Sequence, residues 1–257
     1  MKLKFIFPLS VCFLFLIYGQ ESPAQKKQNK NSVEVEKIYP KFSYSPLARE
    51  NVGSTGLTIA LLNPVFLDKD IKRLGSPFSD FAKAMASDLD EVLISKGFRV
   101  IGPFSSFDEM VVSDKNNSDF ILEISIDIEP STIRRWQTIM QLLSSANLYK
   151  VSQGDVSFNG KVSLIAHSCF SKEKLWIKNL DLNQKKFSYS GSVKWPTSNV
   201  NQFEELNQDV NLWNPFCKIL EEYYKESFDI FYKQFEKAEM ANIAKDSRKI
   251  DKERRGN

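Results

Sequence analysis

Residues 57–128 constrain the fold of this chain more than any other part of its sequence. They begin with a short apolar run, residues 57–62, which has the length of a buried strand. Asn63-Pro64 ends that run. A helix is then predicted to begin at Ser76-Pro77, because serine is a good N-cap and proline is tolerated in the first helical turn.

The apolar residues of this helix and of the next two strands recur at the expected spacings. The helical residues form one stripe, and Gly97 is a suitable left-handed residue to end it. Residues 98–101 are predicted as a strand, and residues 119–128 alternate between apolar and polar side chains. The stripe comprises Phe78, Phe81, Ala82, Met85, Leu89, Val92 and Leu93, and the apolar set of the last strand comprises Phe120, Leu122, Ile124, Ile126 and Ile128. A strand–helix–strand unit of this length favours parallel pairing.

The second half of the chain alternates again and then becomes helical. Val156 to Ala166 and Phe187 to Val193 are predicted as strands of an antiparallel meander, with Gly160 at a bulge or a close contact. A long helix should follow, because five apolar residues step by three or four along one face: Leu220, Tyr224, Phe228, Phe231 and Phe235. The predicted class is therefore α+β, a mixed sheet with an N-terminal strand–helix–strand unit, an antiparallel meander and a long C-terminal helix.

The first residues indicate where the protein goes. Lys2 and Lys4 precede a 14-residue apolar run, residues 5–18, and small residues follow up to Ala24. This is the pattern of a secretory signal peptide, and the run is shorter than the roughly 20 residues of a spanning helix. We expect cleavage after Ala24, with cleavage after Gly19 as the alternative, and export to the periplasm or to the outer membrane and cell surface. Lipidation at Cys12 is the alternative, although this cysteine lies in the middle of the apolar run.

The chain is predicted to divide into four parts. Residues 1–24 form the signal peptide, and residues 25–38, rich in Lys, Gln and Asn, form a flexible tether. Residues 39–240 form a single α+β domain. Residues 241–257 are basic and lack an apolar face, so we expect a C-terminal tail that is either a solvated helical extension or disordered.

Charge and motifs argue against nucleic-acid binding and catalysis. The formal net charge is only +3, which is small for a nucleic-acid-binding protein. His167, the only histidine, stands two positions before Cys169 on a predicted strand, about 7 Å apart at the Cα atoms, too far for a tight nucleophile–base pair. Paired zinc ligands, phosphate-binding glycine loops and dinucleotide fingerprints are missing. We therefore expect no enzyme, no metal and no cofactor.

Cys169 and Cys217 are the two cysteines that remain after cleavage at Ala24. In an oxidising compartment they could form a disulfide, which would close a loop of roughly 50 residues and stabilise the fold by a few kcal/mol. The alternative is two buried thiols. Spacing in the sequence does not decide between them.

Three blocks of the sequence together resemble a known family. They are Phe42-Ser43-Tyr44-Ser45-Pro46, the unit that runs from Asn63-Pro64 to Lys96-Gly97-Phe98-Arg99-Val100-Ile101, and the basic end, residues 247–255. They resemble the neuraminyl-lactose-binding haemagglutinin family of bacterial surface lipoproteins, whereas residues 140–215 match poorly. The resemblance implies an α+β fold and an exported adhesin for sialylated glycans or another host surface molecule. The alternative function is an envelope assembly or structural subunit that binds another envelope protein.

The resemblance also implies a place for glycan binding. The family's proposed motif is a short basic run with a Thr-Ile centre, and Thr132-Ile133-Arg134-Arg135 occupies the corresponding place. Pro130-Ser131 stand where two basic residues are expected. Two guanidinium groups could hold a sialic-acid carboxylate, and the Trp136 indole could stack on a sugar. Thr132, Arg134, Arg135 and Trp136 are therefore the predicted ligand residues, the alternative being a solvated turn with Trp136 in the core.

Overall fold

The computed structural model describes residues 36–45, 53–69, 71, 75–135, 149–194, 207 and 209–255. Of residues 130–135, 149–154, 190–194 and 255 only the backbone is described. The chain divides into two units, residues 1–35 and 36–257, and all described residues belong to the second. The predicted signal peptide therefore lies outside the described residues.

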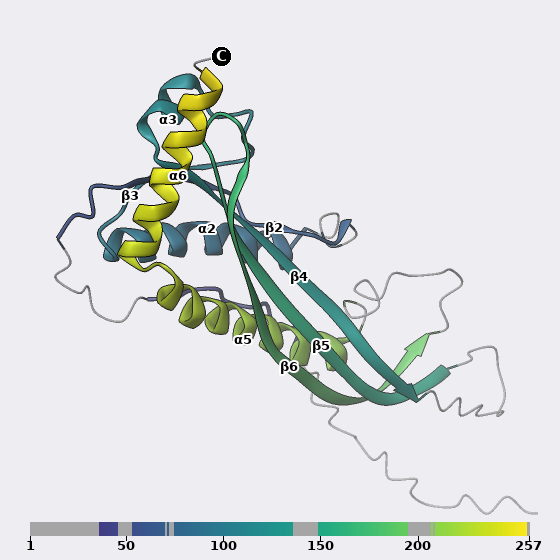
Figure 1. Cartoon of the computed structure of the whole chain (residues 1–257). Helices are drawn as coiled ribbons and strands as arrows, with labels where there is room; N and C mark the ends of the chain where they lie inside the picture. Colours follow the sequence, from purple (N-terminus) through teal and green to yellow (C-terminus); the bar gives the residue numbers. More distant parts are fainter. Residues whose placement is uncertain are drawn as a thin grey trace, which may run out of the picture. The chain divides into compact units, whose positions relative to one another are not determined.

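A six-stranded mixed sheet forms the centre of the second unit (Figure 1). Its strands are β1 (Thr58–Leu62), β2 (Val65–Phe66), β3 (Arg99–Phe104), β4 (Phe120–Arg135), β5 (Tyr149–His167) and β6 (Lys174–Lys194). They lie in the order β3-β1-β4-β5-β6, and β2 pairs with β4. β1 is parallel to β3 and β4, whereas β4, β5 and β6 are antiparallel. The predicted α+β class is confirmed, with both its parallel unit and its meander.

The meander strands are longer than the sequence indicated. β4 continues past Ile128 to Arg135, and β6 includes residues 175–177, which the pattern had placed between two strands. Pro130 does not end β4, because beyond Ile126 the strand pairs only with β5. A proline is tolerated where one side of a strand has no ladder partner.

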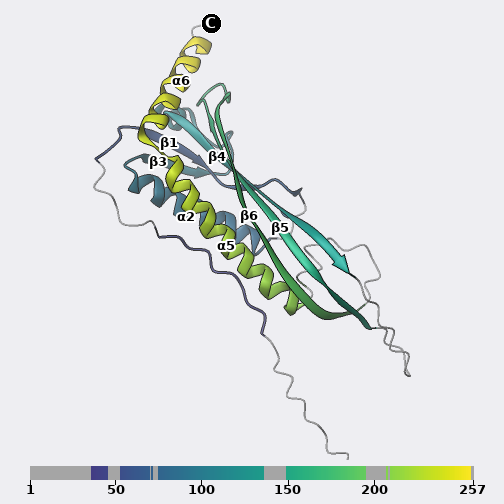
Figure 2. The same cartoon turned by 60° about the horizontal axis from the view of Figure 1, so that its bottom comes forward.

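Two helices pack along one face of the sheet, α2 (Phe78–Ser95) and α5 (Val210–Gln234), as Figure 2 shows. Both predicted stripes are buried there, apart from the half-buried Ala82. Gly97 takes the expected left-handed conformation, with φ at 86°. The start of α2 differs slightly from the prediction, since Pro77 is the N-cap and the Ser76 hydroxyl donates to Asp80 (2.6 Å).

Gly160 lets α5 approach the sheet closely. The register between β5 and β6 shifts between Phe158 and Gly160. A Cβ on Gly160 would lie 2.9 Å from Leu182 Cδ1 and 3.2 Å from Tyr223 Cε1. The Tyr223 hydroxyl donates to the carbonyl oxygen of Phe158 (2.6 Å). The predicted bulge and the predicted close contact therefore both occur at this glycine.

An extended segment, residues 36–45, runs along α5 and α2, and we call it the strap. It forms no strand, and three of its backbone N–H groups donate to side chains of the helices. From first to last, these pairs are Ile38 with Asn214 (2.9 Å), Lys41 with Glu221 (2.7 Å) and Tyr44 with Asp88 (2.6 Å). The Tyr44 ring also stacks on Phe228, with centroids 4.8 Å apart. The strap therefore fastens the start of this unit to both helices.

The chain ends in a separate helix, α6 (Lys237–Arg255), and not in a solvated tail. Apolar residues from its first half join the main core: Met240, Ile243 and Ala244. Ser247 and Asp251 are buried further along the same helix, at 0% and 7% exposed. We had expected the chain beyond Met240 to be solvated or disordered, because polar residues dominate it. The structure shows instead that this polar stretch is docked.

A short helix, α3 (Val112–Asn117), lies between β3 and β4. Beside it, on the sheet face opposite α2 and α5, a small second cluster contains Ala60, Met110, Ile121 and Cys169. Of the helices in the described ranges, none has the length and apolar character that crossing a bilayer requires.

Candidate functional site

The residues predicted to bind a glycan fall at the last part of β4. Thr132, Arg134 and Arg135 are strand positions of which only the backbone is described, and Trp136 lies outside the described residues. Their partners on β5 are, in order, Val156, Gly154 and Gln153. Consecutive positions of a strand belong to opposite faces of the sheet. The strand therefore places positions 134 and 135 on different faces, whereas the sequence had suggested an arginine pair.

His167 is engaged by two acceptors. Its Nε2 lies 2.8 Å from a carboxylate oxygen of Glu123, and its Nδ1 lies 3.2 Å from the carbonyl oxygen of Lys172. The Cys169 thiol donates instead to the carbonyl oxygen of Ser118 (3.3 Å). His167 is thus held by two structural contacts, to Glu123 and to the Lys172 carbonyl group, and it does not activate the cysteine.

The Glu123–His167 pair predicts an acid-dependent loss of stability. The hydrogen bond from His167 holds the pKa of Glu123 below its usual value. A carboxylate with a lowered folded-state pKa stabilises the protein at pH values above its unfolded pKa of about 4.3, and that contribution is lost as the pH falls through the folded-state pKa. Glu123→Gln should therefore flatten the decline in melting temperature between about pH 5 and 3.

Thermal unfolding across this pH range measures the effect. Glu129, an exposed glutamate on the same strand, supplies the matched control, and Glu129→Gln should keep the wild-type pH profile. An acid limb that is equally steep in Glu123→Gln and in the wild type would contradict the prediction.

Cys169 and Cys217 do not form the disulfide that was one of two alternatives. The physical reason is their placement, since Cys169 belongs to the small cluster on one face of the sheet and Cys217 to the main core on the other. Burial also raises the pKa of the Cys217 thiol to about 12. Both cysteines are buried thiols, and Cys217 stays protonated at neutral pH.

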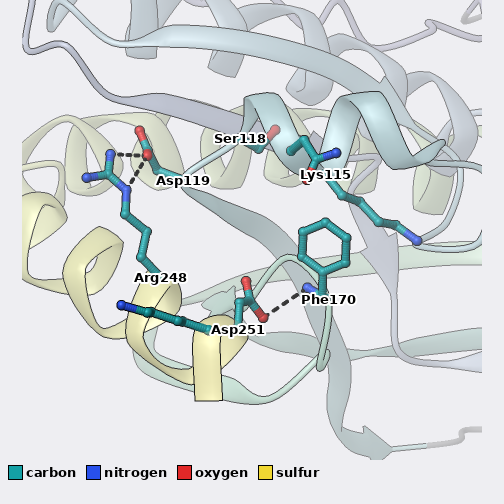
Figure 3. Close-up of a pocket in the computed structure, with 8 residues that line it drawn as sticks. Lys115, Ser118, Asp119, Phe170, Arg248 and Asp251 are labelled. Carbon is teal, nitrogen blue, oxygen red and sulfur yellow. Dashed lines mark hydrogen bonds and ion pairs between the residues drawn. The ribbon is translucent and has the colours of Figure 1, made fainter. Parts of the chain in front are cut away.

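A pocket of about 560 Å³ lies where α3, the turn between β5 and β6, and α6 meet (Figure 3). Its lining residues come from three distant parts of the sequence: Lys115, Asn116, Ser118 and Asp119, then Phe170, then Arg248, Asp251 and Lys252. A volume of this size is within the range of small-molecule sites. The sequence analysis predicted none of these residues as ligand-binding residues.

The Asp119 side chain forms hydrogen bonds with both the sheet and α6, and so fixes one wall of the pocket. One of its carboxylate oxygens accepts the backbone N–H of Thr58 (2.8 Å). The other accepts Nε of Arg248 (2.9 Å) and also its Nη2. Figure 3 shows Arg248 reaching from α6 to this carboxylate. Both oxygens of Asp119 are therefore occupied.

Asp251 ties α6 to the β5–β6 turn. Its carboxylate accepts the backbone N–H groups of three consecutive turn residues: Cys169 (3.1 Å), Phe170 (3.2 Å) and Ser171 (3.3 Å). The bond to Phe170 is visible in Figure 3. This carboxylate holds the turn, and with it the Phe170 side of the pocket, against the last helix.

The carboxylates of the pocket have hydrogen-bond or ion-pair partners, whereas two of its lysines form no ion pair with a described residue. Its two carboxylates, Asp119 and Asp251, are satisfied by Arg248 and by backbone donors. Lys115 and Lys252 form no ion pair with any described residue. The Lys115 ammonium lies 4.2 Å from the centroid of the Phe107 ring, a contact that does not neutralise its charge. The pocket therefore offers two lysine ammonium groups that form no ion pair with a described residue. Among the described residues, no group of three or more His, Cys, Asp or Glu side chains is placed to hold a metal ion.

Comparison with known proteins extends the picture of the fold. No family model matches the sequence, and no curated protein does either. A crystal structure does match, with a TM-score of 0.55 and 15% identity, over 79% of this chain and 97% of the other. The shared fold is that of a Helicobacter pylori protein. It is named as a homolog of the neuraminyllactose-binding hemagglutinin.

This match confirms the fold that the resemblance implied. At 15% identity it shows the fold and not the ligand. Two other structures are more distant: PelC from Paraburkholderia phytofirmans (TM-score 0.26, 11% identity, 66% of this chain, 89% of that chain) and the lipoprotein GNA1162 from Neisseria meningitidis (TM-score 0.25, 12% identity, 65% and 98%). Their scores are too low to support any conclusion.

Proposed function

We propose that this protein is an exported, non-enzymatic component of a bacterial cell envelope that binds sialylated glycans. The observation that carries the proposal is the fold shared with the H. pylori hemagglutinin homolog over 79% of this chain. The signal-peptide pattern of residues 1–24 supports export. The resemblance places the ligand residues at Thr132, Arg134, Arg135 and Trp136, and that location stays a prediction.

The chemistry of the described residues agrees with a binding protein. The only histidine is held between Glu123 and the Lys172 carbonyl group, so it is not available as a general base. The Cys217 thiol is buried, and its pKa of about 12 makes it a poor nucleophile at neutral pH. A ligand would instead be held by charge and hydrogen bonding.

Selective binding to sialylated glycans tests the proposed function. The mature chain, residues 25–257, is applied to an array that pairs each sialylated glycan with its neutral parent. We expect a preference of about tenfold or more for the sialylated member, because one charge-assisted hydrogen bond to a carboxylate contributes about 1.5–3 kcal/mol. Equal binding to sialyllactose and lactose would refute selective binding of sialylated glycans.

The second candidate function, binding to another envelope protein, rests on one surface feature. Val111 and Val112 are adjacent and 58% and 66% exposed, and contact with a partner protein would bury this apolar surface. Crosslinking in the producing cell should then capture an envelope partner. Replacing both valines by serine should abolish that crosslink if this function is the right one.

A further inference from the structure

The chain enters the folded unit at one end of the sheet. The Glu36 carbonyl oxygen accepts the side-chain N–H of Asn214 (3.0 Å), near the start of α5. Near its start, at Phe216, α5 packs on Phe158 of β5, with ring centroids 5.3 Å apart. Phe158 pairs with Pro130 in the last part of β4. The start of the strap and the end of β4 therefore lie at the same end of the sheet, as Figure 2 shows.

The charged pocket lies at the opposite end. Asp119 immediately precedes β4, and Phe170 belongs to the turn that follows β5. β4 contains 16 residues, and a strand rises about 3.3 Å per residue, so its two ends are about 50 Å apart. A protein that is held through residue 36 presents the pocket on the side away from its attachment. The strand positions of Thr132, Arg134 and Arg135 lie on the attached side.

We infer that this pocket is the site that binds the carboxylate of an acidic sugar. Lys115 and Lys252 provide the positive charge, because neither is used in an ion pair with a described residue. Arg248 and the two aspartates are occupied with one another and with backbone donors, so they fix the walls. The Phe170 ring supplies an apolar surface for one face of the sugar. The inference rests on the proposed function and moves its site from the end of β4 to the pocket.

The volume and the openness of the charges fit this class of ligand. About 560 Å³ accommodates one or two sugar rings. Lys252 is exposed and Lys115 is half-buried, so both ammonium groups can turn toward a bound anion without breaking an ion pair. A neutral sugar would gain no ionic contribution to its binding free energy from these two ammonium groups. The pocket should therefore discriminate by charge.

Binding of 3′-sialyllactose and lactose to the mature chain, followed by NMR titration, tests the site. The double variant Lys115→Ala, Lys252→Ala should bind sialyllactose at least about tenfold more weakly than the wild type, with an unchanged melting temperature. Lys249→Ala, on the same helix but outside the pocket, should bind as the wild type does. Arg134→Ala with Arg135→Ala tests the competing site on β4, since a loss of binding in this variant would place the ligand there.

Each outcome decides between the site and the function. If the Lys115, Lys252 double variant binds sialyllactose with wild-type affinity, the pocket is not the binding site. If the Arg134, Arg135 double variant loses binding, the ligand binds at the predicted site on β4, and the proposed function stands. Equal and weak binding of sialyllactose and lactose by the wild type itself refutes the proposed function and the pocket with it.

Discussion

Replacing Asp251 by alanine should lower the free energy of unfolding by about 3 kcal/mol or more. The carboxylate is 7% exposed and accepts three backbone N–H groups of the β5–β6 turn. Hydrogen bonds to a charged acceptor contribute more than neutral ones, and buried donors left without a partner are costly. Deletion of residues 246–257 should destabilise at least as strongly, because it removes Arg248 as well.

Chemical denaturation of the mature chain measures both changes. Asp246 is an exposed aspartate on the same helix, so Asp246→Ala should change the stability by no more than about 0.5 kcal/mol. If the Asp251→Ala variant were as stable as the Asp246→Ala variant, the Asp251 carboxylate would not hold α6 against the turn. That result would instead support the C-terminal tail being solvated, as the sequence predicted.

Replacing Phe231 by alanine should cost about 3–5 kcal/mol. Its side chain is 0% exposed in the main core, and its ring meets Phe228 edge-on, with centroids 5.5 Å apart. Truncation leaves a cavity that the surrounding aromatic rings cannot fill without moving away from one another.

The same denaturation experiment gives this value. Val112→Ala removes apolar atoms from a side chain that is 66% exposed, and it should change the stability by less than about 0.5 kcal/mol. A Phe231→Ala variant with the stability of the Val112 variant would mean that the contact between α5 and the sheet is loose.

The parts of the fold that sequence reasoning predicted are those where apolar residues keep a strict period. The stripe from Phe78 to Leu93 and the alternation from Phe120 to Ile128 are each visible without any tertiary information, and both are buried as expected. Gly160 was informative for a different reason, because a glycine inside a strand pattern marks a place where another group approaches.

The docking of α6 was missed because polar residues occupy part of its buried face. Its buried positions are Met240, Ile243, Ala244, Ser247 and Asp251, which keep a helical spacing. Ser247 and Asp251 lower the hydrophobicity of this segment. The sequence therefore predicted that the apolar stripe fades after Met240. An aspartate in register with such a stripe is a signal in its own right, since a buried carboxylate needs donors and implies a partner segment.

The pocket could not be predicted from spacing along the chain. Arg248 and Asp119 are 129 positions apart, and Phe170 comes from a third segment. Only the pairing of β4 with β5 and the docking of α6 bring these residues together. The site on β4, in contrast, came from a local motif. That motif carries no information about which end of the sheet faces away from the point of attachment.

The strap has a mechanical consequence. It lies along α5, and its three backbone contacts with Asn214, Glu221 and Asp88 are spread along its length. A pull on residue 36 in the direction of α5 therefore loads these contacts together, in shear, so they share the force. A peeling pull, at right angles to the helix, would load them one at a time. Under the proposed function, a cell held by this protein in flowing liquid would tension the strap in its stronger direction whenever the flow aligns the molecule with the pull.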